Sequence, residues 1–147
     1  MGHSTLNSGS ETAVAFSLHP QLAADCHVLG AWPSGQLLLH RNATLHWFIL
    51  VPRTQHLDLL DLEAPLREQL FDDATRLHRY LRDRLAYPRV NVGALGLVVP
   101  QLHLHVVGRR ENDPCWPAPV WGCLGEGPGY AETELDALRI EFRASAT

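Results

Sequence analysis

The sequence is short of charge, of cysteine and of long apolar runs, and each shortage excludes a class of protein. Charged residues make up 19% of the 147 residues, and the formal net charge is -4. This balance argues against a nucleic acid or an anionic membrane as the main partner, although a pocket can be locally positive on an acidic protein. Polar residues interrupt every apolar stretch before it reaches the length of a membrane span, and we expect no secretory signal in the polar N-terminus.

The cysteines give no sign of a metal site or of a disulfide framework. Cys26, Cys115 and Cys123 form no C-x-x-C pair, and three cysteines cannot all pair within one chain. Cys115 and Cys123 have seven residues between them, a spacing that supports no metal pair. We therefore expect free thiols in a cytoplasmic protein.

The remaining composition is that of one globular domain. Hydrophobic residues make up 46% of the chain, enough for a buried core. We expect a flexible leader over residues 1–12, which are rich in Gly, Ser and Asn, and a single domain over 13–147. Short apolar segments separated by turns predict an α+β fold with an antiparallel meander, whose strands are expected at 26–31, 36–40, 45–51, 89–94 and 102–108.

One long helix and two short ones complete the predicted fold. A leucine stripe at helical spacing runs from Leu66 through Leu85, and Pro65 suits the first turn of such a helix. The helix is predicted to continue through Arg84. Shorter helices are expected at 18–25 and at 133–142.

Three polar side chains alternate with apolar ones in the segment Q-L-H-L-H-V-V, residues 101–107. Residues two apart on a strand point to the same face, so Gln101, His103 and His105 are expected to share one face. The opposite face is apolar and is expected to pack on the core. A strand supported in this way is a rigid platform for reactive groups.

Three interpretations of this platform remain open. The histidines are partly exposed residues of an ordinary sheet face, or His103 and His105 bind zinc, iron or nickel, or one imidazole attacks phosphorus in phosphoryl or nucleotidyl transfer. The metal interpretation needs a third ligand. Glu126, Asp113 and His46 are candidates, but the spacing in the sequence favours none of them as the third ligand.

The segment ahead of the histidines favours phosphorus chemistry. Asn91 supplies an amide, and Gly93 and Gly96 let backbone N–H groups approach a phosphate closely. Imidazole is a good nucleophile and leaving group near neutral pH, so a two-step transfer through a phosphohistidine is feasible. In that scheme His103 is the nucleophile, and His105 donates a hydrogen bond to a phosphate oxygen.

Aromatic and basic residues near this strand have simpler interpretations. Trp32, Trp116 and Trp121 can stack on a base, but we expect them to pack loops against the body or a dimer partner. Arg109 and Arg110 follow the histidine strand and can reach phosphates, although arginines at a strand end are more often solvated.

The sequence resembles the histidine-triad superfamily of nucleotide hydrolases and transferases. The resemblance rests on N-V-G-A-L-G-L-V-V-P-Q-L-H-L-H-V-V-G-R-R (91–110) and on W-F-I-L-V-P-R (47–53). The downstream segment D-P-C-W-P-A-P-V-W-G (113–122) is similar to a bacterial branch, which often has Q-φ-H-φ-H. Coverage runs from about residue 18 to residue 122.

This resemblance implies an α+β fold, and a homodimer whose sheets join. His103 would form a covalent nucleotidyl intermediate that water resolves, and His105 would contact the phosphates. Gln101 would take the first triad position, and Asn91 would contact phosphate or sugar. The implied substrates are nucleoside phosphoramidates and dinucleoside polyphosphates, typically purine, and no metal or cofactor is implied.

Four positions depart from the family pattern. Gln101 replaces the first histidine of the triad. Val98 lies where a Ser or Thr usually bonds phosphate, and Asn42 replaces an acidic residue that commonly holds the ribose. A supporting histidine of the neighbouring strand falls at Trp47, although His46 is adjacent.

The leading hypothesis is thus a cytoplasmic, homodimeric nucleotidyl hydrolase or transferase with a small-molecule purine nucleotide substrate. Its predicted catalytic residues are Gln101, His103 and His105, and its predicted substrate-binding residues are Asn42, Asn91, Gly96 and Val98. Two alternatives stay open: a nucleotide-binding protein with little turnover, and a metal-dependent enzyme that uses the His-x-His strand.

Overall fold

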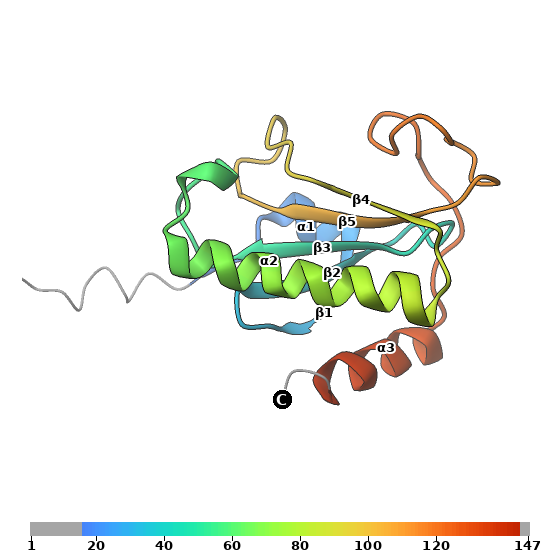
Figure 1. Cartoon of the computed structure of the whole chain (residues 1–147), viewed down its shortest axis with the longest axis horizontal. Coiled ribbons are helices and arrows are strands. Elements are labelled where there is room, and N and C mark those ends of the chain that lie inside the picture. Colours follow the sequence, from blue (N-terminus) through green and yellow to red (C-terminus); the bar gives the residue numbers. More distant parts are fainter. Residues whose placement is uncertain (1–15, 145–147) are drawn as a thin grey trace, which may run out of the picture.

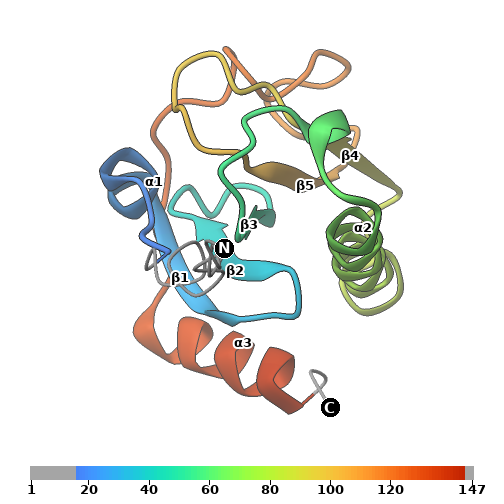
Figure 2. The same ribbon diagram turned by 90° about the vertical axis from the view of Figure 1, so that its left-hand side faces the viewer.

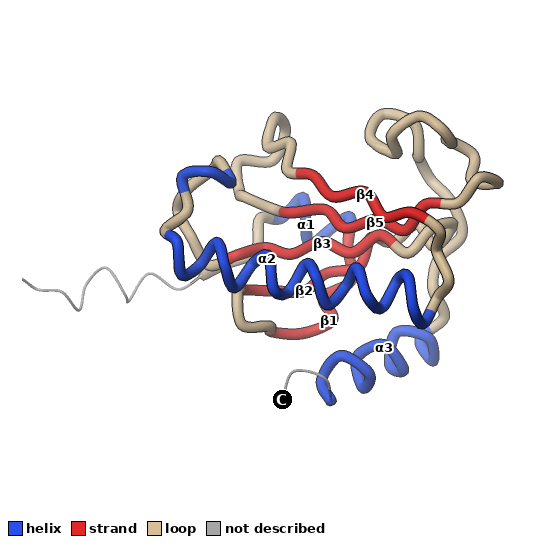
Figure 3. Tube along the Cα trace, in the orientation of Figure 1, coloured by secondary structure: helices blue, strands red, loops and turns tan. Residues whose placement is uncertain are grey.

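An antiparallel sheet of five strands organises the structure (Figures 1 and 3), which is a computed structural model that describes residues 16–144. The leader expected at 1–12 lies outside the described residues, as do 13–15 and 145–147 of the expected domain. The spatial order of the strands is β1-β2-β3-β5-β4. The bounds are β1 Cys26–Ala31, β2 Gly35–His40, β3 Trp47–Pro52, β4 Arg89–Gly93 and β5 Leu104–Arg109. The predicted α+β fold is confirmed, but a simple meander holds only for β1 to β3, because β5 lies beside β3 and leaves β4 at the edge.

Helices form in the three regions where the sequence predicts them, with bounds that differ by up to two residues. Their bounds are α1 Pro20–Asp25, α2 Ala64–Arg79 and α3 Glu132–Ala144, and a 3-10 turn (η1, Leu59–Asp61) precedes α2. The long helix begins with Pro65 in its first turn, as expected, and continues into a π-type turn over Tyr80–Arg84 (η2). Figure 2 shows α2 and α3 away from α1, across the sheet. No helix within residues 16–144 is long and apolar enough to cross a membrane.

The register of the strands gives the sheet two different faces. Phe48 of β3 pairs with Val106 of β5. The ring of Phe48 meets the rings of Tyr80 and Phe142 at centroid distances of 6.2 and 5.4 Å, so η2 and α3 cover this apolar face. The alternate pair, Ile49 with His105, points to the other face, because neighbours along a strand alternate in direction. The fold therefore places His105 on the face opposite the long helix.

Two local expectations are wrong. The last strand begins at Leu104, two residues later than predicted, so Gln101 and His103 lie in the bend before β5. The first helix begins at Pro20 instead of residue 18, because the Nδ1 of His19 accepts a hydrogen bond from the backbone N–H of Gln21 and caps the helix.

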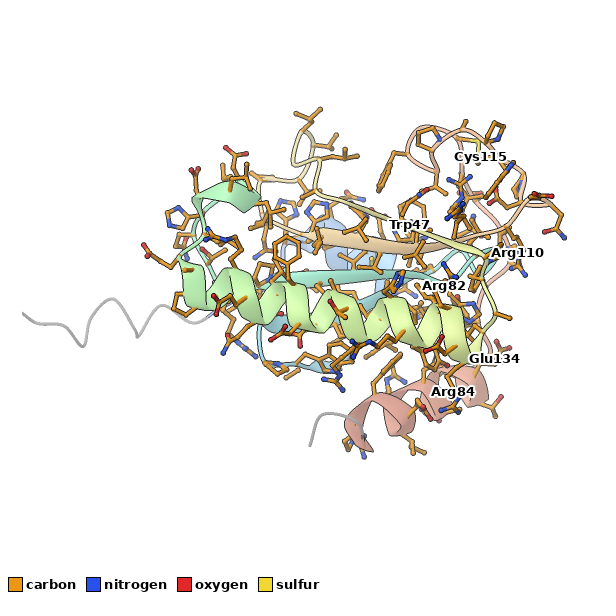
Figure 4. The ribbon with its side chains drawn as sticks, viewed as in Figure 1. Trp47, Arg82, Arg84, Arg110, Cys115 and Glu134 are labelled. Carbon is orange, nitrogen blue, oxygen red and sulfur yellow. A yellow bond between two sulfur atoms is a disulfide. The ribbon has the colours of Figure 1, made fainter. Side chains whose placement is uncertain are left out.

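The expectation of free thiols is also wrong for two of the three cysteines. Cys115 and Cys123 form a disulfide in the loop after β5, where Figure 4 labels Cys115, and their Cα atoms are 6.0 Å apart. Cys26 is a free, buried thiol. Two tight turns reverse this loop, with the N–H of Ala118 donating to the carbonyl of Cys115 and the N–H of Cys123 to that of Val120. The sequence spacing alone does not reveal this reversal.

Candidate active site

Two imidazoles lie against each other where the chain enters β5. The rings of His103 and His105 have centroids 4.9 Å apart and meet edge to face at 68°. Their side chains are largely buried, with residue exposures of 8% and 7%. The structure therefore brings together the two histidines that the sequence singled out, although His103 precedes the strand.

The protonation of His103 follows from the hydrogen bond that its ring makes with the backbone. Its Nδ1 lies 2.6 Å from the backbone oxygen of Gln101. A carbonyl oxygen only accepts, so Nδ1 must carry the proton and donate it. In the neutral ring the other nitrogen, Nε2, then has the free lone pair. The backbone of Gln101 thus leaves His103 with Nε2 as its nucleophilic atom.

The protonation of His105 is the opposite, and Trp47 is the reason. The indole Nε1–H of Trp47, labelled in Figure 4, donates to the Nδ1 of His105 at 2.9 Å. An indole only donates, so Nδ1 of His105 is the acceptor and Nε2 carries the proton. Burial, together with the nearby rings of His103 and His40, lowers the pKa of His105 to about 3. His105 is therefore a neutral ring with an Nε2–H donor at pH 7.

A third histidine extends the cluster toward a neighbouring cavity. The ring of His40, at the end of β2, stacks on Trp47 at a centroid distance of 4.4 Å. His40 also lines a cavity of about 760 Å³, whose wall includes Asp25, His27, Arg41, Asn42, Glu126 and Tyr130. This volume is in the range of small-molecule sites. His40 and Trp47 thus link the cavity to His105 through a chain of ring contacts.

The side chain of Gln101 is engaged away from the two rings. Its Oε1 accepts from the backbone N–H of His19 at 2.8 Å, and its Nε2 donates to the oxygen of Ser17 at 2.9 Å. Gln101 therefore fastens the segment before α1 to the bend before β5. Only its backbone oxygen, which orients His103, takes part in the histidine pair.

Asn42 lines the cavity, but its amide holds a loop in place. The residue is 4% exposed. Its Nδ2 donates to the oxygen of Gly125 at 2.7 Å, and its Oδ1 accepts from the N–H of Thr44 at 3.0 Å. Gly127 packs so closely that a Cβ on it would lie 2.4 Å from Oδ1 of Asn42. The amide of Asn42 therefore fixes the glycine-rich wall of the cavity.

Asn91 belongs to a buried polar cluster built around Arg109. The Nη1 of Arg109 donates to Oδ1 of Asn91 at 2.9 Å, and its Nε and Nη2 donate to the carboxylate of Asp113 at 2.9 and 3.2 Å. Arg109 is 3% exposed, so the expected solvated arginine is wrong at this position, whereas Arg110 is exposed. The sequence could not show this, because the partner Asp113 meets Arg109 only after the chain turns.

Hydrogen bonds lower the pKa of the Asp113 carboxyl group. Burial by itself raises the pKa of a carboxyl group, but the bonds from Arg109 and from the backbone N–H groups of Cys115, Arg110 and Trp116 outweigh it and lower the pKa of Asp113 to about 2. The Nη2 of Arg109 also donates to the oxygen of Ala118 at 2.7 Å. This ion pair therefore anchors the first half of the loop after β5 to the sheet.

The two remaining predicted contacts lie in the loop between β4 and β5. Gly96 has φ +65°, a left-handed conformation that suits glycine, and its Cβ position would lie 3.8 Å from the oxygen of Leu57. Val98 is 90% exposed. The side chain of Val98 therefore points to solvent, and only its backbone can face a ligand near the histidines.

The ring of Trp121 packs against the histidine pair. Its ring lies 5.4 Å from that of His105, edge to face. The ring also lies on Gly93, where a Cβ would be 3.1 Å from Cη2 of Trp121. The expectation that this tryptophan packs a loop against the body is confirmed. The hydrogen bond from Trp47 was missed, because a family position normally held by histidine gave no reason to expect an indole donor.

The described residues provide no assembled metal site. Within residues 16–144 no group of three or more His, Cys, Asp or Glu side chains is placed to hold a metal ion. Of the candidate third ligands, Asp113 is bound to Arg109, and the ring of His46 shares a hydrogen bond of 2.8 Å with the hydroxyl of Tyr87.

Comparisons with known proteins identify the same region. The family model described as HIT domain matches residues 21–112. Among solved structures, a histidine triad protein from Bradyrhizobium japonicum is 33% identical, with a TM-score of 0.81, over 90% of this chain and 99% of that chain. Histidine triad proteins from Marinobacter aquaeolei (35% identical, TM-score 0.79, 88% and 94% covered) and Sinorhizobium meliloti (31%, 0.80, 88% and 96%) are similar to the same extent. No curated protein matches the chain.

Proposed function

The chain belongs to the HIT domain family, the histidine triad proteins, and from that premise we propose that it hydrolyses or transfers nucleotidyl groups through His103. The family as a whole consists of nucleotide hydrolases and transferases. The finer proposal is that the substrates are purine nucleoside phosphoramidates or dinucleoside polyphosphates, and that a nucleotidyl-histidine forms during the reaction.

The complementary protonation of the two rings is the observation that carries this proposal. His103 offers an Nε2 lone pair, and His105 offers an Nε2–H beside it. A nucleophile needs the first, and a phosphoryl oxygen that gains charge needs the second. The bond from the α-phosphorus to Nε2 of His103 forms as the bond to the leaving nitrogen or oxygen breaks.

The backbone of Gln101 then stabilises the intermediate. Once phosphorus is bound to Nε2, the ring of His103 carries a positive charge that it shares with Nδ1–H. The bond from Nδ1–H to the oxygen of Gln101 becomes charge-assisted and stronger. Water next attacks phosphorus, the phosphorus–Nε2 bond breaks, and the nucleoside monophosphate leaves with His103 restored.

The other predicted residues receive supporting roles in this proposal. Asn91, held by Arg109, faces the phosphates or sugar from β4, and the backbone of the loop containing Gly96 and Val98 supplies N–H donors. The nucleoside occupies the cavity beside His40, whose glycine-rich wall Asn42 fixes. A volume of about 760 Å³ leaves room for a purine nucleoside.

We also propose the homodimer, with two β4 strands joined edge to edge. β4 is one of the two edge strands of the sheet in the described residues, the other being β1. Val92 on β4 is 48% exposed, so this edge also carries apolar surface. An unpaired edge with apolar neighbours is the type of surface that a second copy can cover.

A nucleotide-binding protein with little turnover is the second candidate. It is favoured by the side chains of Gln101 and Asn42, whose polar atoms are bound to backbone groups in place of a substrate. The two candidates differ in whether a covalent adduct forms on His103.

The deciding experiment compares wild type with His103→Ala and with His78→Ala. His78 is an exposed histidine of α2, so its removal controls for the loss of an imidazole elsewhere. Adenosine phosphoramidate and diadenosine polyphosphates are the substrates, without added metal, and rapidly quenched samples are weighed intact. We expect AMP release and an added nucleotidyl mass in wild type and His78→Ala, and neither in His103→Ala. Nucleotide binding without turnover or adduct, with guanosine analogues included, would favour the second candidate.

A further inference from the structure

A disulfide closes the loop that brings Trp121 to the histidine pair. Cys115 and Cys123 are bonded, and Trp121 lies between them in the sequence, two residues before Cys123. The ring of Trp121 contacts both Gly93 and His105. This loop lies outside residues 21–112, the part that matches the HIT domain. The contact between loop and site therefore lies downstream of the part that matches the family model.

The loop is firmly held on either side of Trp121. Before it, Arg109 binds the buried carboxylate of Asp113 and also donates to the oxygen of Ala118. After it, the amide of Asn42 binds the oxygen of Gly125. Trp121 lies in the span 119–124 between these anchors.

In the described residues, the disulfide is the one covalent cross-link between that span and the rest of the chain. Val120 is fully buried, and its oxygen accepts from the N–H groups of Cys123 and Leu124 at 3.0 and 2.9 Å. The indole N–H of Trp121 is buried and has no hydrogen-bond partner in the described structure, so the ring is held by packing. Loss of the disulfide removes the link that joins the Trp121 half of the loop to the half anchored on Arg109.

We propose that the Cys115–Cys123 disulfide is a reversible redox control of the His103–His105 site, which acts by fixing Trp121 against His105. Its effect on catalysis rests on the proposed function, but its effect on the position of Trp121 does not. In a reducing compartment a disulfide is typically transient and regulatory, so the expected cytoplasmic location suits this role.

The exchange requires a dithiol reductant. Its thiolate attacks Sγ of Cys123, the exposed member of the pair, and Cys115 leaves as a thiolate that takes up a proton. The second thiol of the reductant then breaks the mixed disulfide and releases Cys123. In total the protein gains two electrons and two protons, and the reductant becomes a disulfide. Cys26 does not compete, because burial, with the charge of Asp25, raises the pKa of its thiol to about 12.

The first test counts thiols and follows the rings without any substrate. Purified protein, equilibrated with oxidised or reduced dithiothreitol, is unfolded and alkylated. One reactive thiol is expected in the oxidised form and three in the reduced form. NMR of the histidine rings and indole N–H groups should show His105 and Trp121 signals that move on reduction, while those of Trp32, buried beside Phe142, stay in place. Three thiols under oxidising conditions, or unmoved His105 and Trp121 signals, would overturn the proposal.

Variants separate this effect from reductant acting elsewhere. Cys123→Ser removes the link at its exposed end and should give the reduced-form spectrum under both conditions. Cys26→Ala, the matched control, should respond to dithiothreitol as wild type does. A Cys123→Ser spectrum identical to that of oxidised wild type would contradict the proposed role.

The catalytic consequence is measured last. Reduction and Cys123→Ser should each lower kcat/KM for adenosine phosphoramidate by roughly tenfold, since a misplacement of about 1 Å can cost up to ~100-fold. If no form of the protein turns over, nucleotide affinity replaces the rate, and the proposed function has failed by itself. Equal rates or affinities in the oxidised and reduced forms would refute the control of the site.

Discussion

Replacing Trp47 by phenylalanine tests whether a hydrogen bond from the neighbouring strand sets the chemistry of His105. The change keeps an aromatic ring in β3 but removes the Nε1–H that donates to Nδ1 of His105 at 2.9 Å. It also replaces the indole that stacks on His40 by a smaller ring. His105 then has a buried acceptor without a partner, and its ring is oriented only by packing against His103 and Trp121.

The magnitude follows from these losses. A buried acceptor left unpaired costs about 1–3 kcal/mol, and the smaller ring leaves a void, so we expect the free energy of unfolding to fall by about 2–4 kcal/mol. The neutral form of His105 loses a stabilising bond, which raises its pKa from about 3 toward its ordinary value. A disoriented donor should lower kcat/KM by roughly tenfold, equivalent to about 1.4 kcal/mol of transition-state stabilisation.

Trp32→Phe is the matched control for this experiment. Trp32 and Trp47 are both 5% exposed, but Trp32 packs against Phe142 and lies under the guanidinium of Arg76, away from the histidine pair. It should lose stability to a similar degree without a change in rate or in the ring signals of His105. The measurements are urea unfolding, 15N NMR of the histidine rings and steady-state rates. An unchanged Nδ1 signal of His105 in Trp47→Phe would show that the bond is absent in solution, and an unchanged rate would refute its positioning role.

Two further predictions concern stability. Because the pKa of His105 is about 3 in the folded protein against an ordinary 6.5, the unfolded state binds more protons between these values, so stability should fall as the pH drops from about 6.5 to 3. The full difference corresponds to on the order of 5 kcal/mol, and His105→Asn should have a shallower pH dependence of urea unfolding; equal slopes would contradict the lowered pKa. Asp113→Asn leaves the buried Arg109 without its counter-ion and should cost about 3–5 kcal/mol, whereas Asp136→Asn, in the exposed pair with Arg139, should cost less than about 1 kcal/mol. Similar losses of stability in both variants would refute the larger contribution of the buried pair.

The periodic parts of the fold were predictable because their signals are local. Leucine spacing and Pro65 located α2, and apolar alternation located the strands to within a few residues. The start of β5 was placed two residues early, because alternation continues through Gln101 and His103 although the chain bends there. Which strand lies beside β3 depends on contacts between distant segments, and the pattern of apolar residues does not predict the order of the strands.

The candidate site divides in the same way. The alternation of residues 101–107 was enough to single out His103 and His105 as neighbours. From the sequence we expected Arg109 to be solvated and all cysteines to be free. Both expectations are wrong, because Asp113 and Cys123 reach their partners only through the turns of one loop. The amide of Asn42 was expected to face a substrate, yet it binds Gly125, which lies 83 residues away in the chain.

By itself the sequence determined the α+β class, the long helix and the pair of histidines, because periodicity and residue type act over a few neighbouring residues. Only the tertiary structure decided which nitrogen of each ring carries the proton, since that depends on the carbonyl of Gln101 and on the indole of Trp47 from another strand. It likewise decided the pairing of Cys115 with Cys123 and the position of Trp121 against His105. The sequence determines which reactive groups are present, but their protonation states and surroundings depend on residues that meet only when the chain folds.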